Sequence, residues 1–527
     1  MSLRRLSTSA ASAAATGLPW ASSSSSSSSL WRRTATTTRY TMTISSFSTT
    51  ATAHSGAPLS APKPISDYTP YLTALSRARQ PSAIRALLPL ITQPGMLSFA
   101  GGMPNPATFP IARMSMTLTD GTVLDLDEAS TREALQYGPT PGHSGLVTYL
   151  SALQDQVHGP AKDSVAHDRA VQLGNGSQDL LAKAIAAMVA PGDTLLVESP
   201  CYAGTLSILR PMARAMGVKL VEVPTDEQGL VPEKLAALLD KWPSTASATG
   251  EAAPRKPRVL YTVPTGGNPS GATAPLHRRH AVYEIMQKHD LVLLEDDPYY
   301  YLQFTPDLVT ANAAATLSTP LDLAGARPYA THLLPSYLSM DTDGRVLRFE
   351  SFSKIVSAGL RLGMATGPAP LIERIFLDTQ STSLQPTGPS QAMFLALARS
   401  VWQNKPDGFL AHAARVAAFY QTRRDRLVLA LKPLVDKGLI EYYVPKAGMF
   451  LWIKIKGVTD TRALINAHAM QKKVLLLPGV EFLPNGGDCA YVRATYSTAT
   501  DEEMDEGMLR FAECIVNATT TTTTSAQ

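Results

Sequence analysis

Five short apolar runs follow one another through the middle of this chain, separated by segments with a helical or turn-rich pattern. A continuous apolar run bounded by turn residues is typical of a strand that is buried on both faces. Strands of this kind that alternate with helices predict a mostly parallel sheet covered by helices on both faces, which binds ligands at the carboxyl ends of its strands. The runs are TLLVE (194–198), VKLVEVP (218–224), RVLYTVP (258–264), LVLLEDD (291–297) and RFESF (348–352).

The pattern changes at about residue 389, which predicts a second and smaller α+β domain over residues 389–517. This part contains a long helical stretch at about 406–432, several short strands and a final helix. Thr500 followed by Glu503 is typical of a capping box that opens that last helix.

The expected fold class is therefore α/β, with the sheet in a large domain at 111–388. A chain of 527 residues exceeds the roughly 250–300 at which a single hydrophobic core stops growing, so more than one packed domain is expected. An N-terminal arm at 67–110 would precede the large domain. Two hydrophilic stretches, 243–257 and 306–332, lack clear periodicity and are interpreted as surface insertions.

Residues 1–66 differ in composition from the rest of the chain. They are rich in Ser, Thr and Ala and contain no acidic residue, so the basic excess of the whole chain lies in this segment. Such a composition is typical of an organelle transit peptide, and we expect a mitochondrial location. A start at Met42 would remove most of the basic residues and could leave a cytosolic form; a plain disordered tail is the other alternative. Residues 518–527 are Thr-rich and are also expected to be disordered. The basic residues of the leader are Arg4, Arg5, Arg32, Arg33, Arg39 and Lys63.

Composition also excludes two classes of protein. No apolar run approaches the ~18–20 residues that a membrane crossing needs, so we expect no membrane span. The cysteines Cys201, Cys489 and Cys514 are too few and too far apart for a disulfide framework or a zinc cluster. We therefore expect no metal site.

Lys354 is the strongest single indication of chemistry. It lies in SFSKIVSAGLRLG, after Ser351 and Ser353 and seven positions before Arg361. A lysine amine can form a Schiff base with an aldehyde, and neighbouring hydroxyls and a guanidinium suit a phosphate. Pyridoxal phosphate carries both groups. The alternative, a solvated surface lysine, would have to explain why other segments supply the rest of such a site.

Two segments before it suit the phosphate and the ring. The turn GNGSQ (174–178) precedes a helix with an apolar face, and the N-terminus of a helix offers free N–H groups to an anion. A simple helix cap would give the same pattern. Tyr202 follows a strand by a few residues and could stack on a planar ring, although such a tyrosine is more often part of the core.

Three polar residues follow two further strands. Asn268, in the turn PTGGNPSG, could donate to a phenolate oxygen, or could bond its own turn. Asp296 ends the strand LVLLEDD, where a buried carboxylate needs a cationic partner such as a protonated pyridine nitrogen. Tyr299, three residues later, could donate to the same phenolate as Asn268.

Arg493 lies in the mostly apolar strand YVRATYS of the smaller domain. An arginine there needs an anion, and a substrate α-carboxylate bound by two hydrogen bonds is one candidate. A structural salt bridge is the alternative.

Taken together, residues 70–515 resemble the class I/II aminotransferases, which have the pyridoxal phosphate-dependent transferase fold of type I. The similarity is closest to the subgroup of kynurenine/2-aminoadipate and aromatic amino-acid aminotransferases. The segments that carry it are LSFAGGMPNPATFP (97–110), LQYGPTPGHSGL (135–146), GSQDLL (176–181), ESPCYAGTL (198–206), PTGGNPSG (264–271), LLEDDPYYYLQF (293–304), PSYLSMDTDGRVLRFESFSKIVSAGLRLG (335–363) and YVRATYS (491–497).

The resemblance implies a role for each residue. Lys354 would be the Schiff-base lysine and proton shuttle, Asp296 would pair with the pyridine nitrogen, and Tyr202 would stack on the ring as the third catalytic residue. Asn268 and Tyr299 would bond the phenolic oxygen, and Arg493 with Asn268 would meet the substrate carboxylate. The expected phosphate ligands are Ser177, Gln178, Ser351, Ser353 and Arg361.

The resemblance further implies a homodimer with shared active sites, because Tyr137 would reach the cofactor and substrate of the partner subunit. The arm at 67–110 would act as a lid over the substrate. Within it, Arg85 would meet a distal carboxylate and Gly102 would line the pocket. The long leader and the two insertions depart from the family pattern.

The implied reaction is transamination of an aromatic amino acid, kynurenine or 2-aminoadipate with 2-oxoglutarate, in a ping-pong mechanism. A β-lyase or decarboxylase acting on a similar amino acid stays open, because reaction specificity depends on substrate orientation. A regulatory protein with this fold would carry a DNA-binding module, and the first 66 residues contain no helix-turn-helix pattern, so no nucleic-acid partner is expected.

Overall fold

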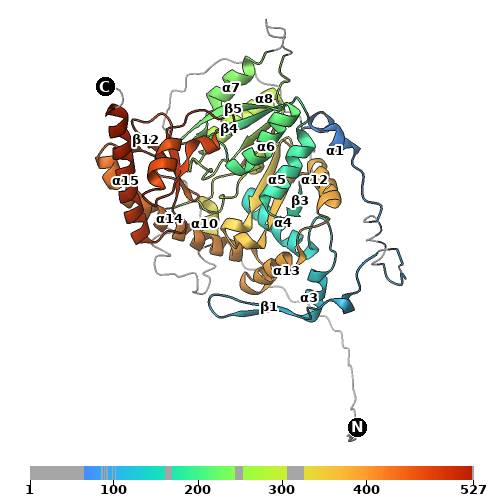
Figure 1. The fold of residues 1–527 in the computed structure, drawn as a ribbon. Coiled ribbons are helices and arrows are strands. Elements are labelled where there is room, and N and C mark those ends of the chain that lie inside the picture. The colour runs from blue at the N-terminus through green and yellow to red at the C-terminus, as the bar shows by residue number, and fades with distance from the viewer. Residues whose placement is uncertain are drawn as a thin grey trace, which may run out of the picture. The chain divides into compact units, whose positions relative to one another are not determined.

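The computed structural model describes residues 64–84, 87, 90, 93–97, 99–100, 102–160, 169–243, 253–305 and 326–524. The main sheet has eight strands in the order β3-β10-β9-β8-β7-β4-β5-β6 (Figure 1). Neighbours from β9 to β5 are parallel, whereas β10 and β6 run antiparallel to their neighbours, so the expected mostly parallel sheet is confirmed. The strands are β3 (Arg169–Gly174), β4 (Thr194–Ser199), β5 (Lys219–Asp226), β6 (Gly229–Leu230), β7 (Val259–Thr262), β8 (Val292–Asp296), β9 (Val346–Ser351) and β10 (Gly363–Pro368).

The central strands β7, β8 and β9 are buried along their whole length, and successive side chains enter the cores on opposite faces of the sheet. Leu195 and Val197 pack in the core that includes α5 and α6, whereas Leu196 between them packs with α7 and α8. The helices of the large domain are α3 (Glu128–Leu135), α4 (Ser144–His158), α5 (Ser177–Met188), α6 (Ala203–Met216), α7 (Pro232–Asp240), α8 (Leu276–His289), α11 (Tyr337–Met340), α12 (Ala369–Thr382) and α13 (Gly388–Ala396).

Strand β10 carries no apolar run, and its small residues have a steric reason. A Cβ on Gly363 would lie 2.6 Å from the backbone nitrogen of Ser177, and a Cβ on Gly367 would lie 2.8 Å from the carbonyl oxygen of Val346. The strand therefore passes directly against the N-terminus of α5, which a larger side chain would prevent.

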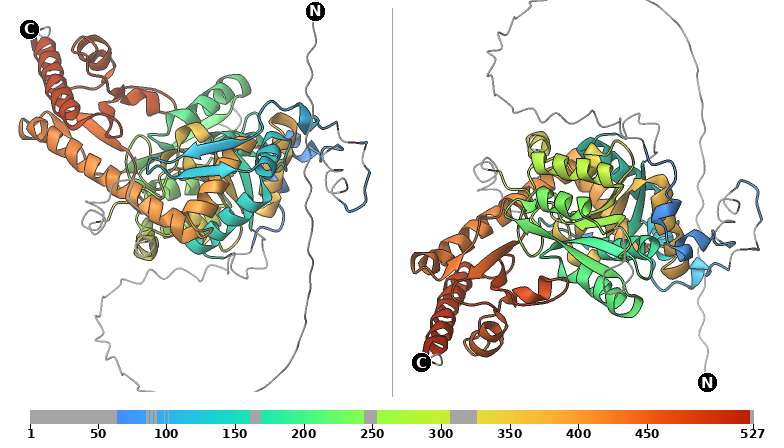
Figure 2. Two further views of the ribbon diagram at one scale, coloured as in Figure 1. Left: turned by 90° about the horizontal axis from the view of Figure 1, so that it is seen from below. Right: turned by 90° about the horizontal axis from the view of Figure 1, so that it is seen from above.

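A second, four-stranded sheet lies in the C-terminal part, in the antiparallel order β11-β12-β14-β13. Its core contains side chains from the two long C-terminal helices, which Figure 2 shows in orange and red. The capping box of the last helix is confirmed, because Thr500 and Glu503 exchange hydrogen bonds of 2.7 and 3.2 Å. The elements are α14 (Pro406–Asp436), β11 (Ile440–Glu441), β12 (Phe450–Ile455), β13 (Leu477–Pro478), β14 (Tyr491–Thr495) and α15 (Asp501–Thr524).

The two sheets are joined by close contact between backbones. The N–H of Gly448 donates to the carbonyl of Leu302 at 3.0 Å. Gly266, with a φ of +55°, approaches so closely that a Cβ there would lie 2.7 Å from the carbonyl carbon of Ala447. The turn that follows β7 is thereby held against the segment that leads into β12.

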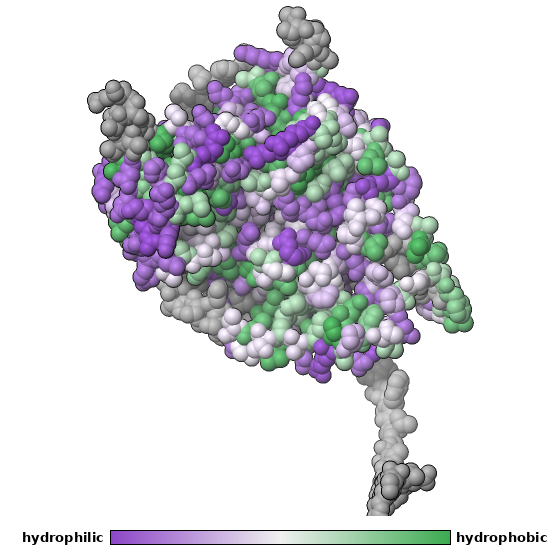
Figure 3. All heavy atoms as spheres, in the orientation of Figure 1, coloured by the Kyte–Doolittle hydropathy of each residue, from purple (hydrophilic) through white to green (hydrophobic). Residues whose placement is uncertain are grey.

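The segment before the large domain is partly anchored and partly exposed. Tyr68 and Tyr71 are buried, and the Tyr68 hydroxyl donates to the carbonyl of Gly344 at 2.8 Å. Further along, Leu97 is 86% and Phe99 100% exposed; Figure 3 shows hydrophobic side chains at the right of the view, where this segment lies in Figure 1. Short elements in this region are η1 (Thr69–Tyr71), α1 (Ala74–Ala78), η3 (Pro106–Thr108), β1 (Met114–Thr117) and β2 (Val123–Leu126).

Most of the two stretches interpreted as surface insertions lies outside the described residues. The end of the second stretch is an exception: it forms helix α10 (Ala326–His332). Tyr329 is buried there and its hydroxyl donates to the carbonyl of Tyr301 at 2.6 Å. The surface interpretation is wrong for this part, because Tyr329 and Ala330 pack the helix against the core. Among the described residues, no helix combines the length and the apolar character that a membrane crossing requires.

Candidate active site

Lys354 lies just beyond the carboxyl end of β9, at the last position of the short 3-10 helix η5 (Phe352–Lys354). The Ser351 hydroxyl caps this helix by accepting the N–H of Ser353 at 3.3 Å. Lys354 is partly buried. Burial, together with the nearby Arg361 guanidinium, lowers the pKa of the Lys354 amine from its ordinary value. The unprotonated, nucleophilic amine is therefore more accessible at neutral pH than for a solvated lysine.

Arg361 connects this helix to the N-terminus of α5. Its backbone is left-handed, with a φ of +50° that is uncommon for a residue with a side chain. The guanidinium donates to the Ser353 hydroxyl and to the carbonyl of Asn175, both at 3.3 Å. Gly176, with a φ of +93°, leaves room for this contact, because a Cβ there would lie 2.4 Å from Nη2 of Arg361. A cation, a hydroxyl and a helix N-terminus thus meet at one point, which is suitable for binding a phosphate.

Gln178 has a different contact from the one expected. Its side-chain amide donates to the carbonyl of Gly204 at 2.8 Å, which ties the N-terminus of α5 to that of α6. The backbone N–H groups of Ser177 and Gln178 are then the groups that suit an anion. Gly204 also accommodates Tyr202, because a Cβ on Gly204 would lie 2.4 Å from Cζ of that ring.

Asp296 is buried at the carboxyl end of β8. Oδ2 accepts a hydrogen bond from the Tyr261 hydroxyl at 2.9 Å, whereas the buried Oδ1 has no partner among the described residues. Burial raises the pKa of Asp296 to about 6, although the Tyr261 hydrogen bond and the charge of Arg348 act in the opposite direction. Since no lysine, arginine or histidine of the described part lies within 4.0 Å of Asp296, its charge is available to a cationic ligand.

Arg493 on β14 is a second charge without a counter-ion among the described residues. Its Nη1 donates to Oδ1 of Asn268 at 2.9 Å, and its buried Nε has no partner in the described part. The guanidinium lies 4.5 Å from the ring centroid of Phe450 and 5.2 Å from that of Phe482. A cation in this aromatic environment suits a carboxylate that shares the site with an apolar or aromatic group.

Tyr299 is buried beside this group. Burial raises the pKa of the Tyr299 phenol, and a hydrogen bond with Asn268 partly offsets this rise. Burial raises the pKa of the Tyr202 phenol. The charge of Asp296 acts in the same direction and those of Arg493 and Arg361 in the opposite one, so all three charges lie near this side chain.

Three predicted residues do not belong to this enclosed group in the described chain. Arg85 lies outside the described residues. Tyr137 is 50% exposed. Gly102 is also exposed, and a Cβ there would meet no atom within 4 Å.

Four residues of the site were missed by the sequence analysis: Phe450 and Phe482 beside Arg493, Tyr261, and Thr205, whose hydroxyl donates to that of Tyr261 at 2.8 Å. Tyr261 lies within an apolar strand and is indistinguishable from a core tyrosine until the register of β7 and β8 is known. The only available signal for Thr205 was its position one helical turn after Tyr202.

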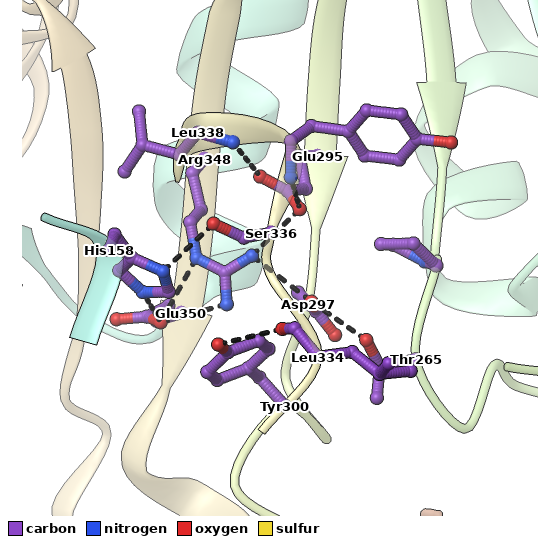
Figure 4. Close-up of polar contacts among 12 residues, drawn as sticks. His158, Thr265, Glu295, Asp297, Tyr300, Leu334, Ser336, Leu338, Arg348 and Glu350 are labelled. Carbon is purple, nitrogen blue, oxygen red and sulfur yellow. Dashed lines mark hydrogen bonds and ion pairs between the residues drawn. The ribbon is translucent and has the colours of Figure 1, made fainter. Parts of the chain in front are cut away.

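A buried cluster of one arginine and three carboxylates lies at the ends of β8 and β9 (Figure 4). The fully buried guanidinium of Arg348 lies 2.9 Å from Glu295, 3.0 Å from Asp297 and 2.9 Å from Glu350. Asp297 also accepts the Thr265 hydroxyl at 3.0 Å. Because Glu295 and Asp297 flank Asp296 in the chain and Asp297 reaches the turn after β7, the cluster fixes the backbone on which the candidate site is built.

Comparison with known proteins identifies the wider family. Residues 115–511 match the family "Aminotransferase class I and II". The mitochondrial kynurenine/alpha-aminoadipate aminotransferase of Bos taurus is 38% identical over 457 residues, covering 85% of this chain and 99% of the relative. Aminotransferase tdiD of Emericella nidulans is 36% identical over 461 residues, covering 85% and 96%. The structure of aminotransferase Aro8 from Candida albicans is similar with a TM-score of 0.72 and 26% identity, covering 87% of this chain and 99% of that one.

Proposed function

The chain belongs to the class I and II aminotransferases, and we propose that it transfers the amino group of kynurenine, 2-aminoadipate or an aromatic amino acid to 2-oxoglutarate. The family fixes the reaction type, transamination with pyridoxal 5′-phosphate. The choice of donor is supported by the names of relatives such as the Bos taurus enzyme.

The observation that carries the proposal is a pair of opposite charges without counter-ions among the described residues. Within the part of the chain that the structure describes, Oδ1 of Asp296 is buried without a partner and Arg493 pairs with no carboxylate. An uncompensated buried charge is costly, so a ligand is expected to neutralise both. A protonated pyridine ring would satisfy Asp296, and the α-carboxylate of an amino acid would satisfy Arg493.

The residues present fit pyridoxal 5′-phosphate on these grounds. Bound to the enzyme, this cofactor supplies an aldehyde that bonds an amine and a ring that accepts electrons. Lys354 would provide the amine. Arg361, Ser353 and the start of α5 would bind the phosphate, and Tyr202 would cover one face of the ring. Asn268 and Tyr299 would donate to the phenolic oxygen.

Lys354 is also proposed to move the proton that leaves the substrate α-carbon. Its lowered pKa favours the unprotonated amine, which accepts that proton and can return it at a neighbouring atom. Arg493 would hold the substrate carboxylate and so orient the α-carbon. The negative charge of Asp296 would pair with the protonated ring nitrogen. Removal of the α-proton is then favoured over other bond cleavages by orientation.

Selection of the side chain is proposed to depend on aromatic surfaces and on the N-terminal arm. Phe450 and Phe482 next to Arg493 support acceptance of an aromatic donor. Arg85, by resemblance, would meet the distal carboxylate of 2-aminoadipate or 2-oxoglutarate. We expect Arg85→Ala to weaken 2-aminoadipate and glutamate more than tryptophan or phenylalanine; equal losses would contradict this role.

The proposal extends to assembly and location. The exposed Leu97 and Phe99 support burial of the arm in a homodimer, in which Tyr137 would reach the partner's site. Light scattering of the purified enzyme tests this point, and a monomer that is fully active would refute it.

The basic leader and the mitochondrial relatives support import into mitochondria. Imaging of a fluorescent fusion of the full chain tests this location, and a fusion that starts at Met42 provides the control.

The decisive experiment is a panel of amino donors with 2-oxoglutarate. Each donor should yield its 2-oxo acid and glutamate in equal amounts. Ammonia or carbon dioxide in place of glutamate would instead indicate a lyase or a decarboxylase. If no aromatic donor, kynurenine or 2-aminoadipate reacts faster than alanine, the proposed donor class is wrong.

A further inference from the structure

A hydroxyl pair lies between α6 and Asp296. The Thr205 hydroxyl donates to the Tyr261 hydroxyl at 2.8 Å, and the Tyr261 hydroxyl donates to Oδ2 of Asp296 at 2.9 Å. Both Thr205 and Tyr261 are fully buried. Neither residue has a role in the reaction as proposed so far.

The direction of each hydrogen bond follows from the groups themselves. An ionised carboxylate only accepts, so the single proton of Tyr261 must point to Asp296. The Tyr261 oxygen can then only accept, and Thr205 must donate to it. With Asp296 ionised, one arrangement of protons therefore satisfies both hydroxyls and Oδ2.

The fold makes this contact rigid. In the parallel pair of β7 and β8, Tyr261 lies opposite Leu294, two residues before Asp296 on the same face of the sheet. Thr205 lies in the first turn of α6, three residues after Tyr202. The helix that presents the candidate stacking ring thus also fixes the hydroxyl behind the carboxylate.

We propose that Tyr261, oriented by Thr205, is a positioning residue that holds the plane of the Asp296 carboxylate and directs Oδ1 to the ring nitrogen of the cofactor. With Oδ2 occupied, Oδ1 is the one oxygen of this carboxylate left without a partner in the described part of the chain. The inference rests on the proposed role of Asp296 and adds the groups that make that role possible.

Other charged and titratable groups also influence Asp296, and they come from the strands and turns packed around it. Arg348 on β9 favours the ionised form. Burial acts in the opposite direction and is the larger effect, so the Tyr261 hydroxyl is the direct donor that favours the charged carboxylate. The other titratable groups near Asp296 have raised pKa values, chiefly because they are buried, and are therefore mostly neutral at pH 7; they are Glu198, Cys201, Tyr202 and Tyr299.

Titration of the cofactor-free enzyme with pyridoxal 5′-phosphate at several pH values tests the inference. In the wild type, affinity should fall as pH falls through about 6, where Asp296 takes up a proton. In Tyr261→Phe the carboxylate loses its donor, and this midpoint should move up by about one pH unit, as expected for a hydrogen bond to a charged group. In Thr205→Val the midpoint should move in the same direction by a smaller amount.

Tyr329→Phe is the matched control, because it removes a buried tyrosine hydroxyl bond away from the site; its midpoint should equal that of the wild type. Thermal melts of the cofactor-free proteins verify that each variant is folded. If Tyr261→Phe and Thr205→Val both keep the wild-type midpoint, the inference is overturned. If Asp296→Asn leaves affinity unchanged at every pH, the proposed role of Asp296 itself fails, which is a separate outcome.

Discussion

Nη1 of Arg493 lies 2.9 Å from Oδ1 of Asn268 and joins a strand of the second sheet to the turn after β7. Because a guanidinium only donates, this contact fixes the amide orientation and leaves Nδ2 of Asn268 as a donor. The proposed ligand of the substrate carboxylate is thus connected to a proposed ligand of the cofactor.

Arg493→Met should raise KM for the amino donor by roughly 30-fold or more. Loss of one member of a buried charge pair costs about 2 kcal/mol or more, and about 1.4 kcal/mol corresponds to tenfold. Affinity for pyridoxal 5′-phosphate should change much less, because Arg493 is proposed to bind substrate. Steady-state kinetics and cofactor titration of the same preparation measure both. An unchanged KM would assign Arg493 a structural role only.

Gly176→Ala should weaken pyridoxal 5′-phosphate binding by roughly tenfold or more. The new Cβ would displace the Arg361 guanidinium, and a lost hydrogen bond to a charged group costs about 1.5–3 kcal/mol. Gly192→Ala is the matched control: its φ of +75° is similarly unfavourable, but a Cβ there meets no atom within 4 Å. Only the first variant should lose affinity, measured by titration of the cofactor-free protein. Equal affinities would show that Arg361 is not needed for the phosphate.

The sequence predicts the central strands because each is a short, near-continuous apolar run between helical or turn-rich segments. It also predicts that Asn268, Asp296 and Lys354 come close together, because the carboxyl ends of parallel strands meet at one edge. The structure places the three residues at or beyond the carboxyl ends of the neighbouring strands β7, β8 and β9, whereas their chemical roles remain predictions.

Other features depend on distances that a sequence does not contain. Strand β10 was missed because its small residues reflect contact with α5 and not hydrophobicity. The use of the Gln178 side chain between two helices, and that of Tyr261 beneath Asp296, follow from the packing of α5, α6 and β7. Arg85 lies outside the described residues, so its role stays a prediction.

Affinity for pyridoxal 5′-phosphate should decrease as pH falls through about 6. The pKa of Asp296 in the cofactor-free protein is raised to about 6, so below this value the carboxyl is neutral and must lose a proton before it pairs with a protonated ring. The cofactor phosphate also titrates near pH 6. Asp296→Asn retains the phosphate titration and lacks that of the carboxyl, so the difference between the two binding curves isolates Asp296. Superimposable pH profiles would contradict the prediction.

Lys354→Ala should abolish transamination and the visible absorbance that depends on the covalent attachment of the cofactor. The Lys354 amine is the one nucleophile proposed for the aldehyde. The substitution leaves the proposed phosphate ligands Arg361 and Ser353 in place. Borohydride reduction of the wild type followed by peptide mass analysis should place the cofactor on residue 354. Lys183→Ala, which changes a lysine that pairs with Asp179 on α5, serves as the control and should keep the covalent label.

Arg348→Met should destabilise the protein by roughly 3 kcal/mol or more, because it leaves buried carboxylates without their cation. Arg113→Met, which breaks an exposed pair with Asp125, should change stability by no more than about 0.5 kcal/mol.

The loss of stability caused by Arg348→Met should also depend on pH. Burial raises the pKa of Asp297 even beside Arg348. At Glu350, burial is outweighed by the charge of Arg348 together with the contact with His158, which hold the pKa at about 2. Without Arg348, the pKa of Asp297 would rise further and that of Glu350 would rise above its unfolded value. Such groups bind more protons when folded, so their destabilising effect is absent at low pH and grows as pH rises. Thermal melts at pH 5 and at pH 8 should therefore show a larger loss for Arg348→Met at pH 8. A loss that is equal at both values would mean that the cluster stabilises by packing and not by charge.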